Sequence, residues 1–143
     1  MTGALNSALL KVRTRQGEKA VTTKILVVDD SSTVRMLQTT TMKGEGYEVE
    51  EAANGVEALK RILEFRPDIV LMDVVMPEMG GIQCLRQIKA HPQIKHTKVI
   101  MVTTLGEEEN IETAFASGCD DYVTKPIRKL DLLTKIRTLL EKM

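Results

Sequence analysis

The stretch Ile25-Leu-Val-Val-Asp-Asp30 places four consecutive apolar residues, three of them β-branched, directly before two aspartates. A short apolar run without polar alternation is typical of a strand that is buried on both faces. Such strands occur in parallel sheets that helices cover on both sides. The stretch therefore predicts a central strand of an α/β sheet, with two carboxylates at the carboxyl end of that strand.

The same pattern recurs along the rest of the chain. Short apolar runs alternate with longer stretches whose apolar residues recur at helical spacing. The strand-like runs are 25–28, 47–51, 69–72, 99–103 and 122–123, and the helical stretches are 33–43, 56–65, 82–90, 108–117 and 129–141. A strand followed by a helix, five times in succession, predicts an α/β fold with a doubly wound, five-stranded parallel sheet and five helices.

Length and composition limit the function further. The 143 residues fit one domain, so we expect no separate output module. Twenty basic residues balance twenty acidic ones, which gives no overall attraction to nucleic acid, and no apolar run approaches the ~20 residues that span a bilayer. Cys84 and Cys119 form no C-x-x-C pair, which favours a reducing, cytoplasmic location.

The first residues differ in charge from the rest. Residues 1–24 contain five basic side chains and one acidic one. We therefore expect an N-terminal extension over 1–23 and the folded domain over 24–143. Leu5, Leu9 and Val12 stand at helical spacing and permit an amphipathic arm, but a mobile tail is our preferred interpretation.

Residues that carry chemistry follow the predicted strands. Asp29 and Asp30 end the first strand, Asp73 the third and Thr103 the fourth, and Lys125 follows the fifth. In doubly wound folds the functional crevice lies at the carboxyl ends of the strands. Three converging carboxylates repel one another and call for a cation, for which Mg²⁺ is the natural candidate because it prefers oxygen ligands and phosphate.

With these motifs in place, the sequence resembles response-regulator receiver domains, and in its organisation the stand-alone CheY-like regulators. The matching motifs are ILVVDD at 25–30, Asp73 with Met76-Pro77 after it, Val102-Thr103, and YVTKP at 122–126. The resemblance covers residues 24–143 and implies the strand order 2-1-3-4-5.

The resemblance also implies roles for single residues. Asp73 is the phosphoacceptor for a histidine kinase or phosphotransferase, and the protein catalyses only its own phosphoryl transfer and dephosphorylation. Asp29, Asp30, Asp73 and the backbone carbonyl of Val75 hold Mg²⁺. Thr103 and Lys125 contact the phosphoryl group, Tyr122 acts with Thr103 as a switch, and the peptide between Lys125 and Pro126 is cis.

Three positions depart from the family pattern and are expected to tune the site. Val75 and Leu105 stand where many receivers carry polar residues, and Thr104 stands where a very small residue is usual. Apolar groups beside a phosphoryl group hinder the positioning of water, so we expect slow self-dephosphorylation. The alternative function is a phosphorylation-independent interaction module built on the same fold.

Output is expected as a contact made by the domain itself. In receivers the usual contact face is formed by the fourth helix, the fifth strand and the fifth helix, which here would display Ile111, Tyr122, Ile127 and Lys135. Homodimerisation through this face is possible. A role in chemotaxis and a role in a phosphorelay both remain open.

Overall fold

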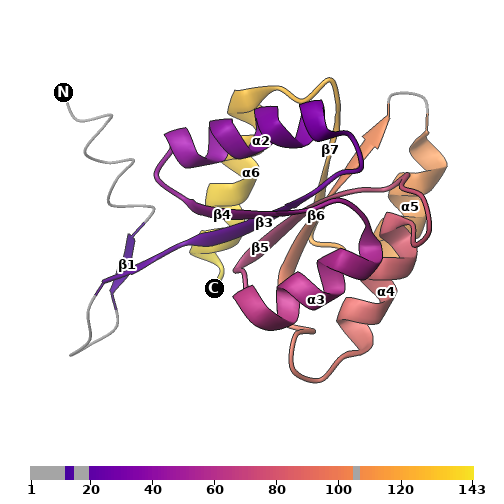
Figure 1. Cartoon of the computed structure of the whole chain (residues 1–143), viewed down its shortest axis with the longest axis horizontal. Helices are drawn as coiled ribbons and strands as arrows, with labels where there is room; N and C mark the ends of the chain where they lie inside the picture. Colours follow the sequence, from indigo (N-terminus) through magenta and orange to yellow (C-terminus); the bar gives the residue numbers. More distant parts are fainter. Residues whose placement is uncertain (1–11, 15–19, 105–106) are drawn as a thin grey trace.

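The computed structural model describes residues 12–14, 20–104 and 107–143. Its centre is a five-stranded parallel sheet with the order β4-β3-β5-β6-β7 (Figure 1). The strands are β3 (Lys24–Val28), β4 (Glu48–Ala52), β5 (Ile69–Asp73), β6 (Lys98–Thr104) and β7 (Asp121–Lys125). Counted along this sheet alone, the order is 2-1-3-4-5, as the resemblance implied.

Five helices cover the two faces of the sheet. They are α2 (Ser32–Gly44), α3 (Gly55–Phe65), α4 (Gly81–Ala90), α5 (Glu108–Ala116) and α6 (Lys129–Glu141). Figure 1 shows α2 and α6 on one face and α3, α4 and α5 on the other. The chain thus forms the three-layer doubly wound fold that the alternating sequence pattern predicts.

The central strand β3 explains why its sequence lacks polar alternation. Ile25 and Val27 belong to the core under α2 and α6, whereas Leu26 and Val28 belong to the core under α3, α4 and α5. All four side chains are buried. Successive residues of a strand point to opposite faces, so a strand between two cores must be apolar throughout.

The helix that follows β3 begins within two residues of the aspartates. Ser31 is the N-cap of α2, and its hydroxyl accepts a hydrogen bond of 3.3 Å from the backbone N–H of Val34. A serine cap satisfies one of the N–H groups that the first helical turn leaves without a partner. The cap fixes where α2 begins and so keeps Asp29 and Asp30 in a tight turn above the sheet.

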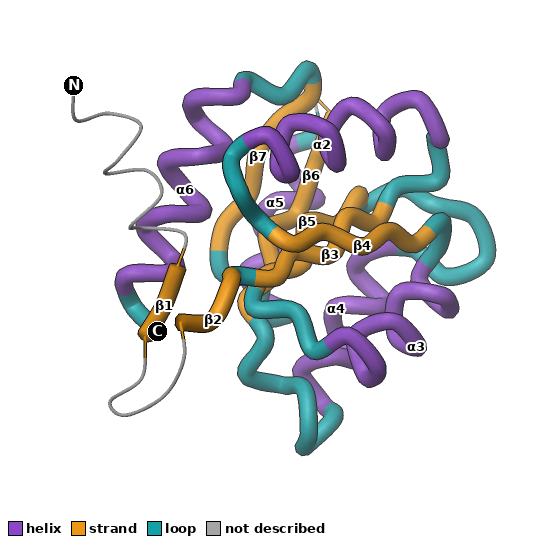
Figure 2. Tube along the Cα trace, turned by 60° about the vertical axis from the view of Figure 1, so that its left-hand side comes forward, coloured by secondary structure: helices purple, strands orange, loops and turns teal. Residues whose placement is uncertain are grey.

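Two features differ from the sequence predictions. β7 is longer than the predicted run 122–123, so Lys125 ends the strand instead of following it. In addition, β1 (Val12–Thr14) and β2 (Ala20–Thr22) form an antiparallel two-stranded sheet that was not predicted (Figure 2). Val12 therefore lies in a strand and not in a helix. The two strands were not predicted because a three-residue strand leaves too short a pattern to detect in the sequence.

The remaining predictions about the extension lie outside the described residues. Leu5 and Leu9 belong to that part, so the amphipathic arm and the mobile tail both stay predictions, as does the domain boundary at residue 24. Among the described residues, every helix is too short or too polar to cross a bilayer.

Candidate functional site

The chain brings the predicted site residues together at one edge of the sheet. Asp29 and Asp30 follow β3, Asp73 is the last residue of β5, Thr103 lies near the end of β6, and Lys125 ends β7. These are the carboxyl ends of four parallel strands, so neighbouring strands deliver their final side chains to the same place. The site is therefore a direct result of the sheet topology.

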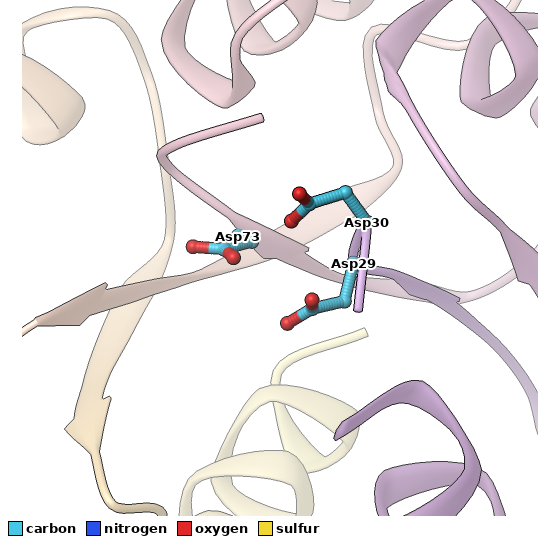
Figure 3. A group of neighbouring side chains, drawn as sticks. All are labelled: Asp29, Asp30 and Asp73. Carbon is cyan, nitrogen blue, oxygen red and sulfur yellow. The ribbon is translucent and has the colours of Figure 1, made fainter. Parts of the chain in front are cut away.

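Three carboxylates form the centre of the site. Asp29, Asp30 and Asp73 each offer an oxygen within 4.8 Å of the others, and their side chains surround one space (Figure 3). Asp29 is 1% exposed and Asp73 is 6% exposed, whereas Asp30 is exposed to solvent. An all-carboxylate donor set open on one side fits a hard cation such as Mg²⁺, which keeps part of its water shell.

Lys125 supplies the positive charge within the described site. Its Nζ donates a hydrogen bond of 3.0 Å to Asp73 Oδ2 and lies 3.2 Å from Asp29 Oδ2. Burial raises the pKa of Asp73; the hydrogen bond from Lys125 lowers it, and the Asp29 charge raises it again. Burial lowers the pKa of Lys125, but the bonds and charges of the two aspartates outweigh this, and the net direction is upward. Lys125 therefore stays an ammonium between two carboxylates.

Backbone and arginine donors hold the aspartates in place. The N–H of Ser31 donates a bond of 2.8 Å to Asp29 Oδ1, and the N–H of Val75 donates one of 3.3 Å to Asp73 Oδ1. Arg35 Nη1 donates a bond of 2.7 Å to the backbone carbonyl of Asp29. Sequence reasoning missed Arg35; its position in the first turn of the helix that follows the aspartates is the signal that could have found it.

Thr103 carries a buried hydroxyl near the end of β6. The residue is 2% exposed, and its Oγ1 has no hydrogen-bond partner among the residues that the structure describes. An unpartnered buried hydroxyl costs free energy. A group aimed at a ligand oxygen would behave in this way, which agrees with the phosphoryl contact that the resemblance implies.

Two of the three predicted tuning positions are exposed to solvent. Val75 is 61% exposed beside Asp73, and Thr104, at the end of β6, is also exposed. Leu105 lies outside the described residues. The peptide between Lys125 and Pro126 is cis, the isomer that the resemblance implied.

Gly81 was not singled out in the sequence, yet it closely approaches the backbone of Asp73 at the end of β5. A Cβ at this position would come 2.1 Å from the backbone oxygen of Asp73. The N–H of Gly81 also donates a bond of 2.8 Å to the carbonyl of Val74. Only glycine permits this close approach of α4 to the end of β5.

The predicted contact face is only partly assembled as expected. Ile111, Tyr122 and Lys135 are half-buried, and the Tyr122 ring stands edge-on to Phe115 at 6.0 Å between ring centroids. Lys135 lies over the Tyr122 ring, 4.8 Å from its centroid. Phe115, which contacts Tyr122 and is 46% exposed, was missed by the sequence analysis.

Ile127 lies elsewhere than predicted. It lines a groove between α2 and the start of α6, here named the α2–α6 groove, with a volume of about 310 Å³. The groove is lined by Val34, Leu37, Gln38, Thr41, Lys125, Pro126, Ile127, Lys129 and Leu132. Because Lys125 lines the groove and contacts Asp73, the groove adjoins the acidic site.

Known sequences point to one family. A family model described as the response regulator receiver domain matches residues 25–137. The transcriptional regulatory protein ResD of Bacillus subtilis is 40% identical over 120 residues, which cover 84% of this chain and 49% of ResD. SrrA of Staphylococcus aureus is 37% identical over 119 residues, covering 83% of this chain and 48% of SrrA. The chain thus spans about half the length of these curated relatives.

Two solved structures superpose on this chain over almost their whole length. The chemotaxis protein CheY4 of Vibrio cholerae superposes with a TM-score of 0.78 at 34% identity, covering 83% of this chain and 99% of CheY4. A putative response regulator of Chloroflexus aurantiacus gives a TM-score of 0.80 at 32% identity, covering 83% of this chain and 98% of that one. With the acidic site at the expected strand ends, the chain belongs to the response regulator receiver domain family.

Proposed function

We propose that this protein is a response regulator that accepts a phosphoryl group on Asp73 from a histidine kinase or phosphotransferase protein. One observation carries the proposal: Asp73 lies between two further carboxylates and the Lys125 ammonium at the carboxyl edge of the sheet. Mg²⁺, held by Asp29, Asp30, Asp73 and the Val75 carbonyl, would supply charge neutralisation for the transferring phosphoryl oxygens.

The proposed step is an in-line displacement at phosphorus. A carboxylate oxygen of Asp73 forms the new P–O bond, and the bond between phosphorus and the donor imidazole nitrogen breaks, with its electron pair going to that nitrogen. The product is an acyl phosphate. Lys125 balances part of the charge on the transferring oxygens, and the unpartnered Thr103 hydroxyl is available to donate to one of them.

The switch would follow from the new phosphoryl oxygens. Thr103 is drawn toward them, and Tyr122 responds in the space that Thr103 vacates. Tyr122 lies on β7 beside α5 and α6, so a change in its side chain alters the contact face formed by these elements. Phosphorylation thus biases two conformers of one surface.

The relatives of this chain act in different biological settings. CheY4, which this chain covers almost completely, is described as a chemotaxis protein, whereas ResD and SrrA are described as transcriptional regulatory proteins. We propose that the domain acts by direct contact with a partner protein, in chemotaxis or a phosphorelay, in the cytoplasm. No direct contact with nucleic acid is proposed for the chain.

The decisive test is the intact mass of the protein after incubation with acetyl phosphate or phosphoramidate and Mg²⁺. A Mg²⁺-dependent gain of ~80 Da that Asp73→Asn abolishes would support the phosphoacceptor. No gain, even with a cognate kinase, would favour the alternative of a phosphorylation-independent interaction module.

A further inference from the structure

Arg35 is the one described side chain that donates to the backbone between the two adjacent aspartates. Its Nη1 donates a hydrogen bond of 2.7 Å to the carbonyl oxygen of Asp29. That carbonyl belongs to the peptide that joins Asp29 to Asp30, so the bond fixes the plane of this peptide. The direction in which Asp30 leaves the turn follows from the orientation of that plane.

The Asp30 carboxylate depends on its backbone for its position. Asp29 is buried, and its carboxylate contacts Ser31 and Lys125. Asp30 is exposed, and none of the described residues makes a hydrogen bond or ion pair with its carboxylate. Of the three carboxylates in the cluster, that of Asp30 therefore depends most on the orientation of the Asp29–Asp30 peptide for its position in the site.

Arg35 is itself held by the edge strand of the sheet. Its Nε donates a bond of 2.9 Å to Glu51 Oε1, and its side chain is 19% exposed. Glu51 lies on β4, next to Ala52, whose carbonyl accepts a bond of 3.2 Å from the N–H of Asp29. Arg35 and β4 thus hold the same residue from two sides. The planar guanidinium holds its Nε and Nη1 donors in a fixed geometry that reaches both acceptors, and the flexible ammonium of a lysine does not reproduce that geometry.

We propose that Arg35, held by Glu51, is a positioning residue of the metal site: it orients the Asp29–Asp30 peptide and thereby sets the affinity for Mg²⁺. The inference rests on the proposed function, because it assumes that the three carboxylates bind Mg²⁺. Partners that orient metal ligands without touching the metal commonly change affinity by 10–100-fold.

Charge and position make opposite predictions for Arg35, which makes the inference testable. Removing a positive charge near a cation site strengthens cation binding through simple electrostatics. Removing a positioning contact weakens it. A weaker affinity for Mg²⁺ in a variant that lacks the arginine therefore supports positioning. An equal or stronger affinity means that Arg35 acts only through its charge, and it overturns the proposal.

The experiment is a Mg²⁺ titration of the ¹⁵N-labelled full chain, followed through amide chemical shifts, for wild type, Arg35→Ala, Arg35→Lys and Arg61→Ala. Arg61 is the matched control because it pairs with Glu50, the neighbour of Glu51 on β4, at 3.2 Å, but extends from α3 on the other face of the sheet. We expect the Kd for Mg²⁺ to rise at least ~10-fold in Arg35→Ala, to rise less in Arg35→Lys, and to stay within about twofold in Arg61→Ala.

A kinetic readout separates positioning from general damage. With acetyl phosphate, Arg35→Ala should need more Mg²⁺ for the half-maximal phosphorylation rate but reach the wild-type rate at saturating Mg²⁺. Should Arg35→Ala lose its folded spectrum, Arg35→Lys takes its place in the test. A Kd for Mg²⁺ raised at least about threefold in Arg35→Lys would then support the inference. Equal Kd values in folded variants overturn the inference alone. Absence of any Mg²⁺-dependent shift in wild type contradicts the proposed function and overturns the inference with it.

Discussion

Lys125 donates a hydrogen bond of 3.0 Å to Asp73 and so joins the ends of β7 and β5 across 52 residues of sequence. The same ammonium lies 3.2 Å from Asp29. One cation thus serves two carboxylates that are almost completely buried. Removing one member of such a group leaves uncompensated charge in a poorly solvated place.

Lys125→Met is therefore expected to lower the free energy of unfolding by about 2 kcal/mol without metal, a value reduced from that of a fully buried pair because Lys125 is 28% exposed. Mg²⁺ should restore part of this loss, because a bound cation replaces the missing charge. Urea unfolding with and without Mg²⁺ measures both values. A loss that Mg²⁺ leaves unchanged would contradict the role of Lys125 as counter-charge in the acidic site.

Asp73→Asn is expected to raise the free energy of unfolding by about 1–2 kcal/mol at pH 7 without Mg²⁺. Burial and the Asp29 charge raise the pKa of Asp73 despite Lys125, so the ionised form is disfavoured in the folded state. This cost is present above the raised pKa and disappears as the pH falls below the ordinary value of 3.8. The stability difference between variant and wild type should therefore shrink between pH 7 and pH ~4. A stability difference that stays constant over this pH range would contradict a raised pKa of Asp73 in the folded state.

Thr103→Val is expected to stabilise the protein by about 1 kcal/mol. It replaces a buried hydroxyl, which has no hydrogen-bond partner in the described part of the chain, with a methyl group of similar size. Thr39→Val is the matched control, since Thr39 Oγ1, on α2, is also buried and forms no hydrogen bond with any residue that the structure describes. Both variants should melt at a higher temperature. If Thr103 contacts the phosphoryl group, only Thr103→Val should lose the phosphorylation-dependent change in the amide spectrum.

Gly81→Ala is expected to destabilise the protein by about 2–3 kcal/mol and to reduce phosphorylation of Asp73. The new Cβ would lie 2.1 Å from the Asp73 carbonyl oxygen, so the end of β5 must move. Gly80→Ala is the control, because the nearest atom to its Cβ would be the Val74 carbonyl oxygen at 3.5 Å, an ordinary contact. Thermal unfolding and the intact-mass assay should separate the two neighbours; equal behaviour would mean that the contact at Gly81 is easily relieved.

Val75→Asn is expected to shorten the lifetime of the phosphorylated protein by on the order of 10-fold. Val75 is 61% exposed next to Asp73, the proposed phosphoacceptor, so an amide there can orient an attacking water without disturbing the core. The decay of the phosphorylated mass after removal of the phosphodonor gives the lifetime. Val56→Asn serves as control, because Val56 on α3 is also exposed, at 55%. An unchanged decay in Val75→Asn would contradict slow self-dephosphorylation by an apolar neighbour.

The sequence predicted the sheet and the grouping of the site for a simple physical reason. Both depend on the backbone: apolar runs identify buried strands, and parallel strands deliver their ends to one edge. That Asp73 and Lys125 would meet follows from this argument without any knowledge of side-chain conformations. The order of the strands was not contained in the pattern and came from the resemblance alone.

Other parts of the site depend on distances that no pattern encodes. The bond from Arg35 to the Asp29 carbonyl requires a particular side-chain conformation and a particular placement of α2 on β4. The approach of Gly81 to Asp73 depends on the angle at which α4 leaves the loop. Ile127 was assigned to the wrong side because the loop after β7 turns toward α2, and a residue in a loop has no periodicity that fixes its direction.

The position of Lys125 after both aspartates in the sequence has a consequence for synthesis on the ribosome. Asp29 and Asp73 leave the ribosome before Lys125, because β7 is the last of the five sheet strands to be synthesised. Until β7 docks, a folding intermediate that contains β3 and β5 would enclose two carboxylates without their counter-charge. Repulsion between the two carboxylates therefore disfavours closing this edge before β7 docks, so that assembly of the acidic site and completion of the sheet coincide.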